Sequence, residues 1–382
     1  MLDGVYRRGI DGAPKFVEVP EPTDEALQSV LHKIITRLMR LLTRRGKNQL
    51  EKAAKKHGTL APDDALVNTV ANLLEKPFVV AGEFSPAYLV LPKSMIITVL
   101  REHQFCFAVD SGEAGQGKLA PVFLTTTNGI EKNLVEIREG NARVIRARLE
   151  DAKFFYTEDQ KISLEQRRDE LKAVVWQEKL GTVLERVERI EKLAAWIAGK
   201  LAPAAKETAA RAGRLCKSDL QTLVVGEKEF TSLQGEMGGI YAKLAGETDA
   251  VAHAIAEHYK PRFAGDSVPS SDAGKFVALA DKLDDLVGCF GIGLVPSSSQ
   301  DPYALRRKAS GIVAILRSIH AELSLRDALN ETILAYPAGR LTTHPHELVT
   351  QIMDFFPSPL GKCFGRNGCR GWDCRGRGGH AN

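Results

Sequence analysis

The segment FVALADKLDDLVGCFGIGLVPSSSQDPYALRRKASGIVAIL, residues 276–316, predicts two helices joined by a glycine-containing turn. Gly291 and Gly293 are expected to end the first helix, because glycine enters the left-handed cap conformation without steric cost. Asp301 is the predicted N-cap of the second helix and Pro302 its first residue. The apolar stripe of the first helix comprises Phe276, Leu279, Leu283, Leu286, Val287 and Phe290, and that of the second Leu305, Ala309, Ile312, Val313 and Leu316.

The composition is that of an ordinary globular protein with two or three domains. The chain has 382 residues, of which 44% are hydrophobic and 26% charged. No apolar run is long enough to cross a bilayer, and the first residues lack the apolar core of a signal peptide. Six cysteines are too few for a disulfide scaffold in a chain of this length. We therefore expect a cytoplasmic protein with no membrane partner.

The net charge of +4 does not indicate a globally basic protein. Residues 357–382 alone hold five Lys or Arg and one Asp, so the other residues hold 47 basic and 47 acidic side chains. Nucleic-acid binding would therefore have to come from local basic patches.

The first 127 residues indicate a small unit of helices and strands. Residues 1–22 are predicted to be irregular because of their prolines, and residues 24–57 and 63–75 to be helical. The runs FVVAGEF, FCFAVD and APVFLTTT predict an antiparallel sheet, with PKSMIITVLREH as a helix between the first two. A basic run in the first helix is either a solvated face or a phosphate-binding patch: Arg44, Arg45, Lys47, Lys52, Lys55 and Lys56.

The rest of the chain is predicted to be almost entirely helical. Gly140 and Asn141 are expected to begin a helix that buries Ile145, Leu149 and Ala152. Further helices are expected at residues 163–200, 203–224, 232–259, 272–290 and 302–324. The predicted fold class is therefore α+β, with a small antiparallel-sheet domain followed by a mostly α-helical domain.

Two motifs with possible ligands do not fit their patterns. GEAGQGKL at residues 112–119 lacks the final Ser or Thr of a phosphate-binding loop and precedes a strand, so a hairpin connection is predicted. The Gly-rich tail, residues 357–382, cannot form a core and is predicted to be disordered. Its Cys363, Cys369, Cys374 and His380 could ligate zinc, but their spacing matches no common zinc module, and an out-of-frame or artificial tail explains them as well.

A basic helix is the stronger candidate for ligand binding. REGNARVIRARLEDAKFF places Arg and Lys side chains away from the predicted apolar stripe, at Arg138, Arg143, Arg146, Arg148 and Lys153. A guanidinium group suits phosphate because its two N–H groups match two oxygens. Glu150 and Asp151 could instead pair with some of these charges.

Several ordered segments resemble the beta subunit of the heterotetrameric, bacterial-type glycyl-tRNA synthetase. They include YLVLPKSMIITVLREHQFCFAV, REGNARVIRARLEDAKFF, VVWQEKLGTVLERVERI, LCKSDL, FTSLQGEMGGIYAKLAGE, AIAEHYKPRFAGD, ADKLDDLVGCFGIG and SSSQDPYALRR. The resemblance covers about residues 76–335, while the first 75 residues match weakly. Family members are longer at both ends, so this chain resembles a central fragment, without the N-terminal and anticodon-binding regions.

The resemblance implies a noncatalytic subunit of glycine-tRNA ligase, an enzyme of protein biosynthesis. In such enzymes the beta subunit binds and positions tRNA(Gly), and the alpha subunit of an α2β2 heterotetramer carries the catalytic site. ATP and Mg²⁺ are then expected at the alpha subunit, with no cofactor, catalytic residue or metal in this chain. Candidate tRNA contacts are Arg101, His103, Arg138, Arg143, Arg146, Arg148, Lys153, Arg306 and Arg307. Arg101 and His103 could equally pair within the fold with Glu102 or Asp110.

The helical part of the family resembles the HD phosphohydrolases, in which His and Asp side chains bind metal. No His is followed directly by Asp here, so only Asp219 and Asp281 remain as degenerate HD-like positions. The resemblance implies an HD-like scaffold, and two alternatives stay open: a helical scaffold for the alpha subunit without tRNA binding, and a metal-dependent HD-type phosphohydrolase. The expected segments are a helical N-terminal part (1–75), an α+β domain with the basic helix (76–160), a helical HD-like domain (161–335), and a terminal helix with the tail (336–382).

Overall fold

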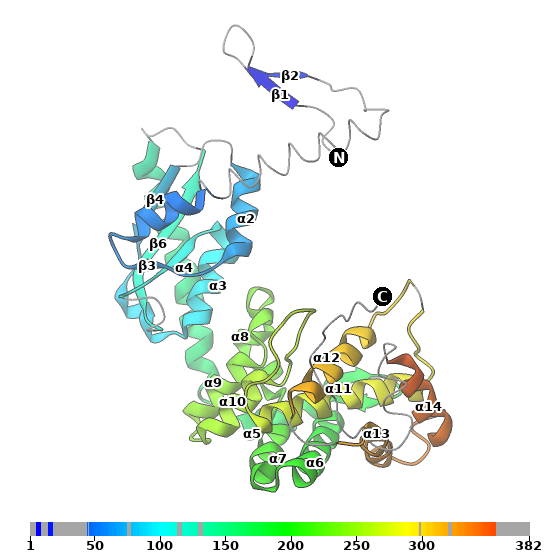
Figure 1. Cartoon of the computed structure of the whole chain (residues 1–382). Coiled ribbons are helices and arrows are strands. Elements are labelled where there is room, and N and C mark those ends of the chain that lie inside the picture. Colours follow the sequence, from blue (N-terminus) through cyan, green and yellow to red (C-terminus); the bar gives the residue numbers. More distant parts are fainter. Residues whose placement is uncertain are drawn as a thin grey trace, which may run out of the picture. The chain divides into compact units, whose positions relative to one another are not determined.

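The computed structural model describes residues 5–8, 14–17, 44, 46–74, 78–112, 117–128, 133–297, 299–319 and 323–356. The chain forms two compact units, Met1–Asp151 (unit 1) and Ala152–Asn382 (unit 2), which are labelled by element in Figure 1. Unit 1 contains the sheet and unit 2 is mostly helical. The predicted α+β class is confirmed, whereas the finer division into four segments stays a prediction.

The core of unit 1 is a four-stranded antiparallel sheet. Its strand order is β3-β5-β6-β4, with β3 at Thr59–Leu60, β4 at Phe78–Glu83, β5 at Phe107–Asp110 and β6 at Leu119–Thr127. The alternating side chains Ala120, Val122 and Leu124 of β6 share one apolar cluster with β5, with the helical residues 46–54 and with α2 (Asp64–Leu73). A second helix, α3 (Lys93–Gln104), packs on β5 and β6.

A glycine fixes the packing between β4 and β6. Gly82 lies opposite Phe123 in the antiparallel register, and the fully buried Phe123 ring covers it. A Cβ atom at residue 82 would come within 2.2 Å of that ring, so only glycine fits beneath it. β5 and β6 pair directly, which confirms that GEAGQGKL connects two strands of a hairpin.

Unit 2 is built around α11 (Asp272–Gly291), the first half of the segment that predicted the fold. All of its residues except Asp272 and Lys275 are buried. α6 (Val183–Leu201), α7 (Lys206–Leu215), α10 (Asp249–Glu257), α12 (Leu305–Ser318), α13 (Leu325–Leu334) and α14 (Pro345–Phe355) pack around it. A helix buried on every face must bury its charged residues as well, so Asp281, Lys282, Asp284 and Asp285 need partners inside the unit.

The long helices predicted between residues 163 and 259 are wrong in part, because the chain turns where the backbone is left-handed. Lys217 and Gly235 have positive φ angles of 67° and 84°. The chain there forms α5 (Leu164–Glu170), η3 (Leu171–Ala173), a small hairpin of β7 (Val175–Gln177) and β8 (Gly181–Thr182), η4 (Pro203–Ala205), η5 (Ser218–Gln221), α8 (Leu223–Gly226), η6 (Lys228–Leu233) and α9 (Glu236–Leu244).

Two N-terminal predictions are also wrong. Residues 1–22 contain a two-stranded hairpin of β1 (Val5–Arg8) and β2 (Pro14–Val17), whose register lets Pro14 stand at a strand end. The basic helix α4 (Leu134–Asp159) begins before Gly140 and Asn141, and the Asn141 amide donates a hydrogen bond to the Ile137 carbonyl inside the helix (2.8 Å). Of the predicted helix at 24–57, the stretch 46–54 is helical and residues 24–43 lie outside the described residues. The Cys and His residues of the tail also lie outside them.

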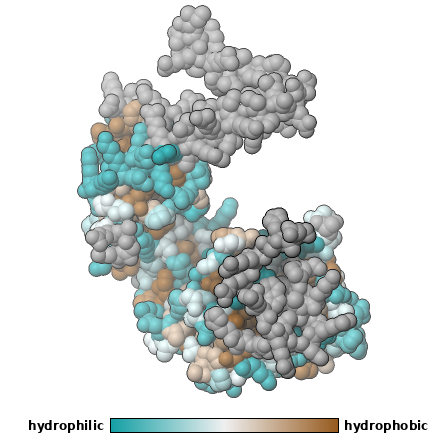
Figure 2. All heavy atoms as spheres, viewed as in Figure 1, coloured by the Kyte–Doolittle hydropathy of each residue, from teal (hydrophilic) through white to brown (hydrophobic). Residues whose placement is uncertain are grey.

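On the face of the molecule in Figure 2, hydrophobic residues are scattered among hydrophilic ones. Within the described residues, no helix is both long and apolar enough to cross a lipid bilayer.

Candidate nucleic-acid interface

The part of α4 that belongs to unit 1 carries four exposed arginines. Ile145 and Leu149 are buried, as the sequence predicted, and fix which face of α4 turns toward the unit. The side chains of Arg138, Arg143, Arg146 and Arg148 are all exposed, while Lys153 in unit 2 is half-buried. An amphipathic helix of this kind can offer its cations to a ligand without disturbing the core.

The acidic neighbours on α4 neutralise only part of this charge. Arg148 pairs loosely with Asp151 (3.9 Å), whereas Glu150 accepts a hydrogen bond of 2.6 Å from the hydroxyl of Tyr88 in η1 (Pro86–Val90). Burial and this hydrogen bond raise the pKa of Tyr88 to about 12, so the phenol stays a proton donor. Within the described part of the chain, Arg138, Arg143 and Arg146 form no ion pair.

Arg101, at the C-terminal end of α3, forms ion pairs with acidic side chains of unit 1. Its guanidinium lies 3.6 Å from Asp63 and 3.6 Å from Glu102. The other proposed internal acceptor, Asp110, is bound by Lys93 at 2.5 Å. The side chain of His103 lies outside the described residues.

The start of α12 differs from the prediction and changes the environment of Arg306. The helix begins at Leu305, after Ala304 in a left-handed conformation, so Pro302 is not its first residue. The prediction of Asp301 as N-cap residue is also wrong, because Ala304 holds that position; the Asp301 carboxylate nevertheless accepts from the backbone N–H groups of Leu305 (2.7 Å) and Arg306 (3.0 Å). The two side-chain oxygens reach these groups across the intervening turn.

Arg306 and Arg307, at the start of α12, have different partners. The Arg306 side chain donates to the Ser297 carbonyl at 2.9 Å, lies 4.0 Å from Asp301 and approaches the Phe355 ring. Arg307 makes one long hydrogen bond, to the Arg262 carbonyl at 3.4 Å, and has no acidic partner among the described residues. The Arg307 side chain is therefore more available than that of Arg306 to bind an anion.

Of the two degenerate HD-like acids, Asp281 is bound by cations of the chain itself. Its carboxylate lies 2.8 Å from Arg186 of α6 and 2.8 Å from Lys217, and all three side chains are buried. Burial alone would raise the pKa of Asp281, but the charges of Lys217 and Arg186 hold it well below its ordinary value. Asp281 is thus an ionised partner in a buried ion-pair cluster.

Asp219 has a separate structural role. Its fully buried carboxylate accepts from the backbone N–H groups of Gly235 (2.5 Å) and Gly238 (3.2 Å), at the start of α9. Burial raises its pKa, and the two backbone hydrogen bonds oppose that shift. The arrangement is that of a helix cap. Among the described residues, no group of three or more His, Cys, Asp or Glu side chains is placed to hold a metal ion.

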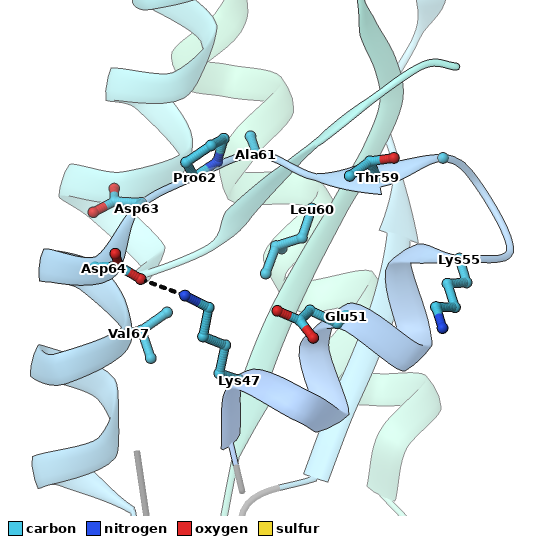
Figure 3. Close-up of a pocket in the computed structure, with 11 residues that line it drawn as sticks. Lys47, Glu51, Lys55, Thr59, Leu60, Ala61, Pro62, Asp63, Asp64 and Val67 are labelled. Carbon is cyan, nitrogen blue, oxygen red and sulfur yellow. Dashed lines mark hydrogen bonds and ion pairs between the residues drawn. The ribbon is translucent and has the colours of Figure 1, made fainter. Parts of the chain in front are cut away.

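One pocket, of about 380 Å³, lies in unit 1 between the helical residues 46–54 and α2 (Figure 3). Lys47, from the predicted basic run, crosses its edge to pair with Asp64 at 2.7 Å. That hydrogen bond and charge raise the pKa of Lys47. Asp63 caps α2 through the Leu66 N–H. Lys47 is therefore already neutralised, while Lys52, Lys55 and Lys56 are exposed and Arg45 lies outside the described residues.

Comparison with known proteins supports the resemblance inferred from the motifs. A family model described as the glycyl-tRNA synthetase beta subunit matches residues 26–371. The chain belongs to this family. A glycine--tRNA ligase beta subunit from Shouchella clausii is 44% identical over 317 residues, which is 82% of this chain and 45% of that protein. The glycine--tRNA ligase beta subunit from Geobacter sulfurreducens is 46% identical over 78% of this chain and 43% of that protein. The one from Halalkalibacterium halodurans is 46% identical over 77% of this chain and 42% of that protein.

The chain spans less than half the length of the family members that it matches.

Sequence analysis did not predict the buried ion-pair cluster of this family member, although a signal exists. Arg186 and Arg189 are three residues apart on α6, and Asp281 and Asp284 are three apart on α11, so matching faces of two helices carry opposite charges.

Proposed function

We propose that this chain is the part of a glycine-tRNA ligase beta subunit that binds and positions tRNA(Gly) for glycylation by a separate alpha subunit. The observation that carries the proposal is the set of exposed arginines Arg138, Arg143 and Arg146 on α4, which form no ion pair with any described residue. Their guanidinium groups would neutralise backbone phosphates and fix the position of the tRNA, with sequence recognition left to other contacts.

The chemistry of glycyl transfer is assigned in this proposal to the alpha subunit of an α2β2 assembly, together with ATP and Mg²⁺. In this chain the two acids at HD-like positions serve ion pairing and helix capping, which favours a scaffold role for unit 2 over a phosphohydrolase. A cytoplasmic location stays a prediction.

Charge reversal on α4 tests tRNA binding. The double variant Arg143→Glu/Arg146→Glu should weaken tRNA(Gly) binding and flatten its dependence on salt, because two phosphate contacts are lost. For duplex-like RNA, each lost contact should lower the slope of log K against log salt by about 0.9. A matched control, Lys172→Glu/Arg326→Glu, alters the net charge equally at exposed sites of unit 2.

The same variants separate the proposal from a scaffold that only holds the alpha subunit. A tRNA-binding chain loses affinity in the α4 variant and keeps it in the control. Equal tRNA affinity in both variants, with normal capture of the alpha subunit, would contradict the proposal and favour the scaffold.

A further inference from the structure

A second candidate contact lies in unit 2, on the loop that follows α10. Phe263 in this loop is 61% exposed, although a phenylalanine side chain is usually buried. The guanidinium of Arg307 in α12 donates to the carbonyl of Arg262, the neighbour of Phe263 in the loop, and the Arg262 guanidinium reaches from the loop to the carbonyls of Ser232 and Gln234.

Contacts with α11 and α12 hold the base of this loop in place. The ammonium group of the buried Lys282 donates to the carbonyls of Tyr259 (3.3 Å) and Lys260 (2.8 Å), just before the loop. Pro261 and Lys282 both pack against Gly311 of α12, where a Cβ atom would come within 3.0 Å of the lysine side chain and 3.3 Å of the proline ring. The base of the loop is thus fixed to α11 and α12.

The tip of the loop is closed by its own hydrogen bonds. The Asp266 carboxylate accepts from the Arg262 N–H (2.7 Å) and the Ser267 N–H (2.8 Å), and the Asp266 N–H donates to the Phe263 carbonyl (3.2 Å). Phe263 therefore projects from a short, internally bonded turn. A rigid aromatic side chain loses little conformational freedom when a ligand binds.

The two guanidinium groups keep their charge available. Arg262 donates to the carbonyls of Ser232 and Gln234, both at 3.4 Å, and Arg307 donates to the Arg262 carbonyl at 3.4 Å. These acceptors are neutral, and neither guanidinium has an ion-pair partner in the described part of the chain. Asp266 is the acid of this turn, and both of its oxygens are occupied by backbone N–H groups.

We propose that Phe263, Arg262 and Arg307 bind an unpaired nucleotide of the RNA, with its base stacked on the Phe263 ring and its phosphate on the guanidinium groups. An exposed aromatic ring beside cations is the arrangement by which proteins hold single-stranded nucleic acid, because an unpaired base offers its face. A base that is paired within an A-form stem does not expose its face for stacking. The inference rests on the proposed tRNA-binding function and adds a second contact to it.

The test measures binding of the whole chain to three RNAs, which are tRNA(Gly), a single-stranded oligoadenylate and a blunt RNA duplex, and in parallel its capture of the alpha subunit. Phe263→Ala should weaken oligoadenylate binding by about 5- to 140-fold and leave duplex binding unchanged. Phe263→Trp should restore oligoadenylate binding, since its ring also stacks. Arg307→Gln should lower the salt slope for oligoadenylate by about 0.7. Leu334→Ala, which removes another exposed apolar side chain, is the matched control and should change nothing.

Three results would overturn the site. If Phe263→Ala binds oligoadenylate as well as the wild type does, the stacking contact does not exist. If Phe263→Ala weakens binding of oligoadenylate and duplex equally, the site has no preference for unpaired bases. Weaker capture of the alpha subunit with unchanged RNA binding makes the loop a protein contact. Each of these leaves wild-type tRNA binding intact, so they differ from failure of the proposed function, in which the wild-type chain binds none of the RNAs.

Discussion

Replacing Arg189 by methionine should strongly destabilise unit 2, because it leaves a buried carboxylate without its main partner. Arg189 donates to Asp284 from Nε (2.6 Å) and Nη2 (3.1 Å), and the Asp284 side chain is only 1% exposed. The Arg189 guanidinium also lies over the Tyr336 ring at 4.0 Å, and the Tyr336 hydroxyl donates to the Asp284 carbonyl (3.1 Å). Among the described residues, the remaining cation that pairs with Asp284 is Arg186, at 3.8 Å.

The expected loss follows from this geometry. Removing one partner of a buried ion pair costs about 3–5 kcal/mol, since the other charge stays desolvated; here Asp284 would keep only the more distant Arg186. For a unit of this size, such a loss lowers the melting temperature by about 6–20 °C. The double variant Arg189→Met/Asp284→Leu removes both charges and should be more stable than Arg189→Met alone, because the buried carboxylate is removed together with its main partner.

Urea unfolding followed by tryptophan fluorescence is the suitable assay, because Trp176 and Trp196 both lie in unit 2. Arg326→Met, at an exposed arginine without an ion pair among the described residues, is the control and should stay within about 0.5 kcal/mol of the wild type. A loss below about 1 kcal/mol for Arg189→Met, or a double variant as unstable as the sum of the two single variants, would refute the reasoning.

Two further predictions concern packing and pH. Gly82→Ala should destabilise unit 1 by about 1–3 kcal/mol, because its methyl group would overlap the Phe123 ring; a wild-type midpoint in urea unfolding would contradict this. The pKa of His258 is lowered to about 3 by burial and by the charge of Lys217, so its imidazole stays neutral in the folded chain and takes up a proton on unfolding below pH 6.5. Stability should therefore fall as pH drops from about 6.5 to 4.5, by at most about 1.4 kcal/mol per pH unit from this group. His258→Gln should flatten that part of the stability profile, and an unchanged slope would contradict the assignment.

The parts of the fold that follow from periodicity were predictable. α11 and its end at Gly291, the three longer strands of the sheet and α3 lie where their apolar patterns indicated. Breaks set by single backbone conformations were not predictable in this way. Lys217 takes a left-handed conformation that lysine rarely adopts, and Ala304 does the same before α12, so the helices there end or start away from the expected residues.

The exposed arginines of α4 could be predicted from a helical stripe, since that pattern separates the buried face from the solvent face. Which of them are neutralised depends on contacts between segments distant in sequence. Glu150 is held by Tyr88, 62 residues away, and Asp281 is bound by Arg186, 95 residues away. Phe263 gave no signal at all, because its exposure is set by the turn that Asp266 closes.

The most direct test of the central claim is equilibrium binding of the chain to tRNA(Gly) over a series of salt concentrations, with an unrelated tRNA as the control. The account predicts binding that weakens steeply with salt, because phosphate contacts release counterions, and that favours tRNA(Gly) over the control. Negligible binding, or equal binding to both tRNAs, would contradict a tRNA(Gly)-positioning role for this chain.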